Sequence, residues 1–270
     1  MIALTFIREM ISMKMQMRVW SLVGCLLLSQ VNVSSSEETI RLTNGEWAPY
    51  FSENLEYYGV GSRIVTEAFA LEGITVIYGF FPWSRGLKLA ENGSWDGAVG
   101  WEINAEREQD LYASDDVWET PWVFFYMKKN TFDWKAFDDL KDVRIGATLG
   151  YMYTKEFLDA ERSGKISVDR GATSDQQGFR KLMAGRFDIF PQLIDVGYYQ
   201  LNASYDAQTV NLFTHHPTPF GKHKEQLLLS KKHERNIRLI KLFNKGLRQL
   251  KDSGKYDEYF NELRRDKPRH

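Results

Sequence analysis

Apolar and polar residues alternate beyond residue 37 in a pattern that predicts strands and helices in turn. Short runs of β-branched, aromatic and apolar residues that end at Asn or Gly predict strands. Apolar residues spaced three or four apart predict helices. On these criteria we expect strands at 40–43, 74–80 and 95–100, with helices at 61–71 and 84–92 between them. This order implies crossover connections and a mostly parallel sheet in an α/β fold.

A second series of the same kind comes next along the chain. We expect further strands at 122–127, 144–149, 188–193 and 226–230, and helices at 153–160 and 175–184. Regular apolar spacing over 234–251 predicts a long amphipathic helix, and a short helix is expected at 256–263. The two series predict two α/β lobes. Because no repeat or Pro/Gly-rich linker separates them, we expect the chain to cross between the lobes in extended segments.

The beginning of the chain resembles an export signal. An apolar run, Val19–Leu28, follows Lys14 and Arg18 and precedes small polar residues ending at Ser36. This pattern predicts a signal peptide over residues 1–36 that is cleaved after Ser35 or Ser36, and hence a periplasmic protein. The run is only half of the roughly 20 apolar residues that span a bilayer.

Cys25 has two interpretations. Leu22 to Cys25 spell a lipoprotein-type box, which would tether the protein, but the apolar run continues past Cys25 and favours an ordinary residue of the signal peptide. As the chain's one cysteine, it excludes an internal disulfide framework and a cysteine-based zinc site. We expect no metal and no cofactor.

Composition indicates a globular protein. The 270 residues are 43% hydrophobic and 26% charged, which excludes a disordered chain. Lys and Arg number 35 against 36 Asp and Glu. The near balance of charge gives no basic surface for nucleic acid.

Four motifs occur in an order that resembles the family 3 extracellular solute-binding proteins, the amino-acid receptors of bacterial ABC importers. Each motif is weak alone, and the ordered set over residues 37–265 is specific. They are Asn44–Tyr50 (NGEWAPY), Phe81–Leu87 (FPWSRGL), Trp95–Gly100 (WDGAVG) with Asn104–Arg107 and Tyr112–Ser114, and Leu247–Tyr256 (LRQLKDSGKY).

The resemblance implies a two-lobed type II periplasmic-binding-protein fold. Lobe 1 would comprise residues 37–120 and 223–270 and lobe 2 residues 121–222, with two hinge crossovers near Glu119–Pro121 and Lys222–Lys224. It further implies a monomeric, non-enzymatic protein that holds a small polar carboxylate, an amino acid, between closing lobes and delivers it to an inner-membrane ABC permease.

The resemblance also implies roles for an arginine and three aromatic residues. Arg107 matches the residue that binds the ligand carboxylate, to which a guanidinium donates two parallel hydrogen bonds. The competing interpretation is a surface ion pair with a neighbouring glutamate. Trp47 and Trp83 match the rings that flank the ligand, and Tyr50 is a further candidate; core packing is the alternative for each.

Smaller residues complete the expected site. Asn44 would contact the distal group of the ligand or serve only its Asn-Gly turn. Gly100 would let the backbone approach the ligand, and Thr148 and Gly150 would shape an anion-binding turn at a helix start.

Two departures leave the ammonium partner open. Glu102 stands where a small hydroxyl residue is common, and Leu193 stands where an aspartate usually binds the α-ammonium group. Either Glu102 or Asp195 could replace that aspartate, and Glu102 would also suit a more cationic ligand.

Two other functions remain open. The same fold hosts exported cyclohexadienyl or arogenate dehydratases, in which Glu102 would be the acid–base candidate. Alternatively, the protein would be a periplasmic sensor acting on a membrane signalling partner.

Overall fold

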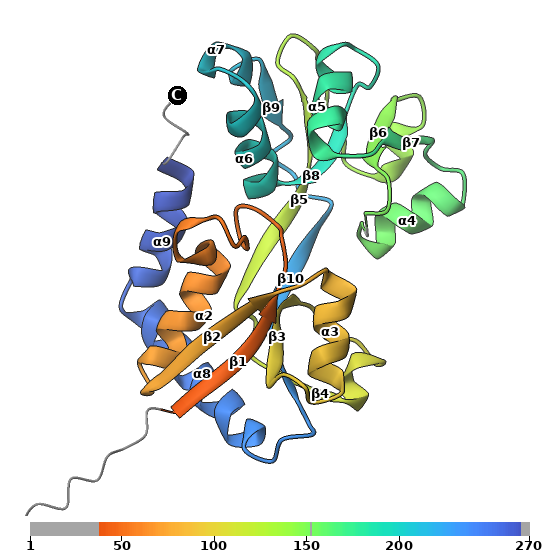
Figure 1. Cartoon of the computed structure of the whole chain (residues 1–270). Coiled ribbons are helices and arrows are strands. Elements are labelled where there is room, and N and C mark those ends of the chain that lie inside the picture. The colour runs from red at the N-terminus through yellow and green to blue at the C-terminus, as the bar shows by residue number, and fades with distance from the viewer. Residues whose placement is uncertain (1–37, 152, 266–270) are drawn as a thin grey trace, which may run out of the picture. The chain divides into compact units, whose positions relative to one another are not determined.

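The computed structural model describes residues 38–151 and 153–265 (Figure 1). The predicted signal peptide, including Cys25 and the expected cleavage sites, lies outside the described residues. The chain divides into two units, Met1–Glu38 and Thr39–His270. The second unit, together with Glu38 where the first strand begins, forms the fold.

Strands and helices alternate over most of the described chain. The strands are β1 (Glu38–Asn44), β2 (Ile74–Phe80), β3 (Gly97–Trp101), β4 (Leu111–Ala113), β5 (Trp118–Met127), β6 (Ile145–Thr148), β7 (Val168–Ala172), β8 (Phe190–Leu193), β9 (Phe213–His215) and β10 (Gly221–Ser230). The helices are α2 (Val60–Ala70), α3 (Trp83–Glu91), α4 (Lys155–Arg162), α5 (Asp175–Met183), α6 (Ile194–Ser204), α7 (Ala207–Val210), α8 (Asn236–Asp252) and α9 (Lys255–Arg265), with 3-10 turns η1 (Glu56–Tyr58), η2 (Arg107–Gln109) and η3 (Phe137–Leu140).

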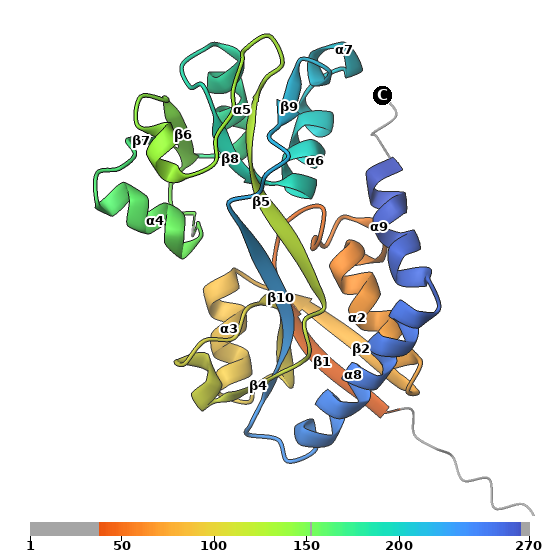
Figure 2. The ribbon, with the colours of Figure 1, turned by 180° about the vertical axis from the view of Figure 1, so that it is seen from behind.

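One large sheet has the strand order β2-β1-β3-β10-β5-β8, with β4 added to β10 and β9 added to β5. Helices α2 and α8 lie on one side of strands β1 to β3, and α3 lies on the other (Figures 1 and 2). β6 and β7 form a separate parallel pair. Strand ends and helix starts of both series therefore flank the long strands β5 and β10.

The expectation of a mostly parallel sheet is wrong for the middle of the sheet. β1 and β3 are parallel, but β10 is antiparallel to β3, β4 and β5, and β5 is antiparallel to β8 and β9. β10 also begins at Gly221, well before the expected start at residue 226, and its polar stretch Gly221–Glu225 pairs with β5 (Figure 2). The long strand β10 therefore inserts between β3 and β5 in the direction opposite to both.

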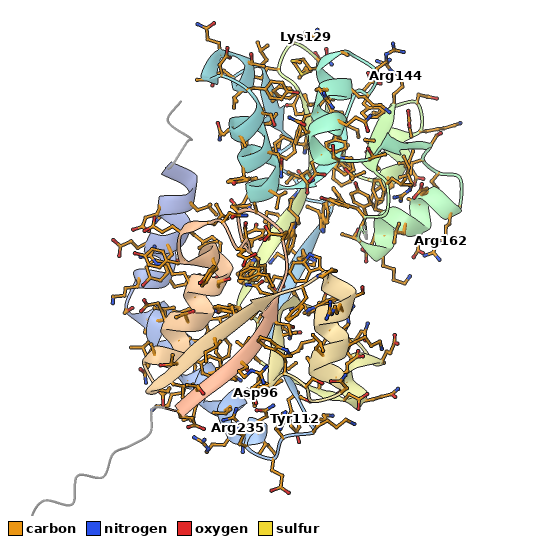
Figure 3. The ribbon with its side chains drawn as sticks, viewed as in Figure 1. Asp96, Tyr112, Lys129, Arg144, Arg162 and Arg235 are labelled. Atoms are coloured by element: carbon orange, nitrogen blue, oxygen red, sulfur yellow. The ribbon has the colours of Figure 1, made fainter. Side chains whose placement is uncertain are left out.

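A buried carboxylate, that of Asp96 immediately before β3, connects β1 to the residue that precedes α8. Asp96 is 6% exposed; it accepts a hydrogen bond from the Arg41 backbone at 2.8 Å and from the Arg235 guanidinium at 2.7 Å (Figure 3). Asn236, at the start of α8, donates to the carbonyl groups of Asp96 and Ser230, both at 2.8 Å. These bonds connect the long carboxy-terminal helix to the sheet.

The core is apolar on both sides of the long strands. α2 and α8 approach so closely that a Cβ on Gly246 would stand 1.9 Å from the Ala68 carbonyl oxygen. Around β5 the core is rich in aromatic rings, and Phe124 and Phe220 stack with ring centroids 4.5 Å apart. Burial of large rings contributes much of the stability of such a domain.

Candidate functional site

Trp83 rests on two glycines. At Gly45 an added Cβ would stand 2.5 Å from the Trp83 ring, and at Gly100 2.7 Å. Gly100 also has a backbone φ of +79°, which residues other than glycine rarely adopt. The Trp83 indole donates to the Glu46 carbonyl oxygen at 3.3 Å. The two glycines therefore fix the position of the half-buried indole, which lies at the ends of β1 and β3.

Arg107 lies on a neighbouring indole. Its guanidinium carbon is 4.6 Å from the centre of the Trp101 ring, which in turn lies 5.7 Å from the Trp83 ring. Nη1 donates to the Glu102 carbonyl oxygen at 2.5 Å, and the Arg107 backbone donates to Asn104. No carboxylate among the described residues forms an ion pair with Arg107. The ion pair considered as the alternative is therefore not formed, and Nη2 and Nε remain available.

Trp47 and Tyr50 lie in the turn that follows β1. Their rings are 5.1 Å apart. The buried Tyr50 hydroxyl lies 3.0 Å from Thr120 Oγ1 on β5 and donates to Asp195 Oδ2, in the first turn of α6, at 3.3 Å. Burial raises the pKa of Tyr50, and the Asp195 charge raises it further. Tyr50 thus connects the turn after β1 with β5 and α6.

The side-chain amide of Asn44 forms its hydrogen bonds within the fold. Its Nδ2 donates to Ser62 Oγ on α2 at 2.9 Å, and its Oδ1 accepts from the Gly45 backbone at 2.9 Å. The side chain is 2% exposed. These bonds correspond to the turn interpretation, and its contact with a ligand stays a prediction.

A pair formed by a buried acid and a half-buried imidazole lies against the same aromatic turn. On β10, His223 Nε2 is 2.5 Å from Glu225 Oε1, and the His223 ring meets the Trp47 ring edge-on at 5.4 Å. The charges of Glu102 and Arg107 both act on Glu225. One predicted site residue, Trp47, therefore contacts this pair, and the charges of two others, Glu102 and Arg107, act on it.

Thr148 belongs to a second polar cluster, between β6 and α5. Thr148 Oγ1 and the Tyr151 hydroxyl donate to Asp175 at 2.9 and 2.8 Å. Burial raises the pKa of the Asp175 carboxyl, although the two hydroxyl groups oppose this. Gly150 is exposed, with φ of +81°. It precedes α4 by several residues, and Thr154, not Gly150, caps that helix.

The residues of these clusters that were not predicted from the sequence include Trp101, Asp175, His223 and Glu225. One usable signal was the spacing of His223 and Glu225, because residues two apart in a strand share a face. Asp175 follows a serine that caps α5, a position typical of acidic residues at helix starts. The sequence offers no comparable signal for Trp101, which is one more aromatic residue in an aromatic-rich chain.

Two other kinds of feature are absent from the described residues. No group of three or more His, Cys, Asp or Glu side chains within residues 38–151 and 153–265 is placed to hold a metal ion. None of the helices in the described part of the chain has the length and apolar character that crossing a bilayer requires.

Solved structures share this fold. An ancestral cationic amino acid solute-binding protein superimposes with a TM-score of 0.65 at 23% sequence identity, covering 83% of this chain and 95% of that one. Substrate-binding domain 2 of Lactococcus lactis GlnP, in an open conformation, gives a TM-score of 0.65 at 17% identity, over 84% and 96%. A second structure carries the same name as the first protein, AncCDT-1, and describes it as an ancestral amino-acid-binding protein and a precursor of cyclohexadienyl dehydratase; it gives a TM-score of 0.57 at 20% identity, over 83% and 94%.

The comparison with curated proteins found no match. The sequence profile of the bacterial extracellular solute-binding proteins, family 3, matches residues 41–263. This range contains the four motifs and all ten predicted site residues. The chain therefore belongs to the bacterial extracellular solute-binding proteins of family 3, and it has their two-lobed type II periplasmic-binding fold.

Proposed function

We propose that this protein is the periplasmic receptor of an ABC importer and binds a small polar carboxylate, an amino acid, between its lobes. The observation that carries the proposal is the state of Arg107, a cation held on the Trp101 ring and unpaired with any carboxylate of the described chain. A charged group kept without a counter-ion beside aromatic rings suits an anionic ligand.

The aromatic residues would contact the body of the ligand. Trp83 and Trp47 are both half-buried and pack against the core with part of each ring. Rings held in this way offer apolar area at little cost in conformational entropy. In this proposal Trp47 and Trp83 flank the ligand and Gly100 admits it to the backbone. Tyr50 is fully buried and supports Trp47 from behind at 5.1 Å between ring centroids, and Asn44, Thr148 and Gly150 are peripheral.

The ammonium group has two candidate partners. Asp195 lies in the first turn of α6 and accepts from Tyr50, whereas Glu102 is exposed beside Arg107. We assign the ammonium to Asp195, because the predicted lobe boundaries put it in the opposite lobe to Arg107, and lobe closure would then bring both charges onto one ligand. Glu102 would then face a cationic side chain.

A thermal-shift screen against amino acids, polyamines and small carboxylates tests the proposal. A compound held at a hundred times its Kd stabilises the fold by about 2.7 kcal/mol. Failure of every carboxylate-bearing compound would refute it. Loss of uptake of the identified amino acid in a deletion strain would establish the import role.

Arg107→Ala supplies the site-specific prediction. Loss of a charge-assisted hydrogen bond costs about 1.5–3 kcal/mol, so Kd should rise at least about tenfold. The control is Arg41→Ala, because Arg41 also lies on an indole, Trp95, at 4.4 Å, but on the far part of β1. Both variants should keep the circular dichroism spectrum. Unchanged affinity in Arg107→Ala would remove the carboxylate contact from the proposal.

An enzymatic function is the second candidate, favoured by the His223–Glu225 pair, because general acid–base catalysis needs such groups beside a substrate. A structural neighbour is described as a precursor of cyclohexadienyl dehydratase. We expect no turnover of prephenate or arogenate. Product formation that His223→Gln abolishes would instead establish the enzyme.

A further inference from the structure

The residues of β10 divide between two faces. His223 and Glu225 point to one face, where Trp47 covers His223. On the other face the side chains of Lys222 and Lys224 are paired with acidic residues, at 2.7 Å from Glu119 and 2.7 Å from Asp116. The lysines are therefore already neutralised, and the charge that Glu225 meets on its own strand comes from His223.

Glu225 is an unusual group for such a strand. It is 1% exposed, and its Oε2 has no hydrogen-bond partner among the described residues. Burial raises the pKa of the Glu225 carboxyl, while the bond to His223 opposes this. Burial also lowers the pKa of His223, but the hydrogen bond and charge of Glu225 outweigh it, and the net pKa is raised. The pair therefore keeps one shared proton to a higher pH than an isolated histidine.

Charged groups reach the pair from the other elements around it. Glu102, after β3, acts on both members, and Arg107, on η2, acts on Glu225. The charges of Asp195, on α6, and of Glu225 both raise the pKa of the Tyr50 hydroxyl. The pair thus lies among the residues to which we assign the ligand.

We propose that His223 is a positioning residue of the ligand site, which through the proton it shares with Glu225 holds Trp47 in place and leaves Arg107 free for the ligand carboxylate. This inference rests on the proposed function. Once the proton leaves, Glu225 carries a buried charge, and the two lysines of its own strand are already paired with Glu119 and Asp116. Arg107 is then the cation without a carboxylate partner that acts on Glu225. The attraction of Arg107 is then divided between Glu225 and the ligand.

The raised pKa of His223 in the folded protein sets the direction of the pH dependence. Tight binding is present below the pKa of His223 in the folded protein and is lost as pH rises through it. Above that value, affinity for a carboxylate falls by up to about tenfold per pH unit, the limit for one linked proton.

The first test needs no ligand. Histidine ring signals are followed by NMR against pH, together with the fluorine signal of 5-fluorotryptophan at Trp47, assigned with Trp47→Phe. We expect the Trp47 signal to titrate with His223 and to become flat in His223→Gln. Glu225→Gln should lower the pKa of His223. A Trp47 fluorine signal that does not change as His223 titrates would overturn the inference.

The second test measures thermal shifts across pH with an equimolar mixture of the standard L-amino acids. The shift should shrink at high pH in the native protein and lose this dependence in His223→Gln. The control is His233→Gln, because His233 Nε2 bonds to the Gly93 carbonyl oxygen, outside this cluster; it should keep the native pH profile. An unaltered profile in His223→Gln would refute the role at the site. Absence of any shift at every pH would count against the proposed function, while the Trp47 titration decides the His223–Trp47 coupling separately.

Discussion

Substitution of Gly100 by alanine tests the part of the site that depends most on geometry. Gly100 stands near the end of β3, has φ of +79°, and lies directly beneath Trp83. An alanine there would bring its Cβ to 2.7 Å from Trp83 Cη2 and 3.0 Å from Phe51 Cε2. The side chain therefore meets two independent penalties, one from the backbone and one from the rings.

Each penalty has a known size. A non-glycine residue in the left-handed region costs about 1–2 kcal/mol, and overpacking of a fitted contact costs about 1–3 kcal/mol. Gly100→Ala should therefore lower the free energy of unfolding by about 2–5 kcal/mol. Gly164 has a similar φ, +73°, with nothing within 4 Å of an added Cβ, so Gly164→Ala should show the backbone penalty alone.

Urea denaturation followed by circular dichroism measures both variants. The difference between them, about 1–3 kcal/mol, is the contact with the rings. In a Trp83→Ala background Gly100→Ala should cost less, which a double-mutant cycle detects. Equal destabilisation by Gly100→Ala and Gly164→Ala would refute the conclusion that Trp83 rests on Gly100.

Two further predictions concern stability. Gly246→Ala should lower the free energy of unfolding by about 1–3 kcal/mol or more, because its Cβ would stand 1.9 Å from the Ala68 carbonyl oxygen; an unchanged thermal melt would contradict the close contact of α2 and α8. The pKa of Asp188 is lowered by its hydrogen bonds from Arg144, so its stabilising contribution is present at neutral pH and lost as pH falls through the folded-state pKa. Because both side chains are more than a third exposed, Asp188→Asn should cost less than about 1 kcal/mol at neutral pH. In strong acid, where the Asp188 carboxyl is protonated, the substitution should cost nothing; a larger loss at neutral pH or a loss that persists in acid in urea titrations would contradict this.

Regular apolar spacing predicted much of the fold. The strand expected at 74–80 is β2 with the same bounds, and the helix expected at 234–251 is α8, Asn236–Asp252. Helix α6 was missed because a glycine and half-buried tyrosines interrupt its apolar face. β10 was predicted too short because its first half, Gly221–Glu225, is polar and forms a strand through pairing with β5. Pairing of distant segments is not visible in local composition.

The site was predictable only in part, for a related reason. Motif order named Trp47, Trp83 and Arg107, and the structure places each beside other aromatic rings. Burial of Glu225 could not be predicted, because an acidic residue in a polar stretch is ordinarily exposed. In the fold Glu225 stands opposite Trp118 on β5, a partner from a distant segment of the chain. The lobe boundaries at 120/121 and 222/223 stay predictions.

The pairing of Lys222 with Pro121 across β5 and β10 has a consequence for engineering. Residues 121 and 222 are neighbours across the two strands. The segment between them, 122–221, therefore has its two ends about one strand spacing, roughly 5 Å, apart. Such a segment resembles an inserted module. Exchange of this segment with that of a relative would need only two neighbouring junctions, although the buried core that it shares with the rest of the chain would have to be matched.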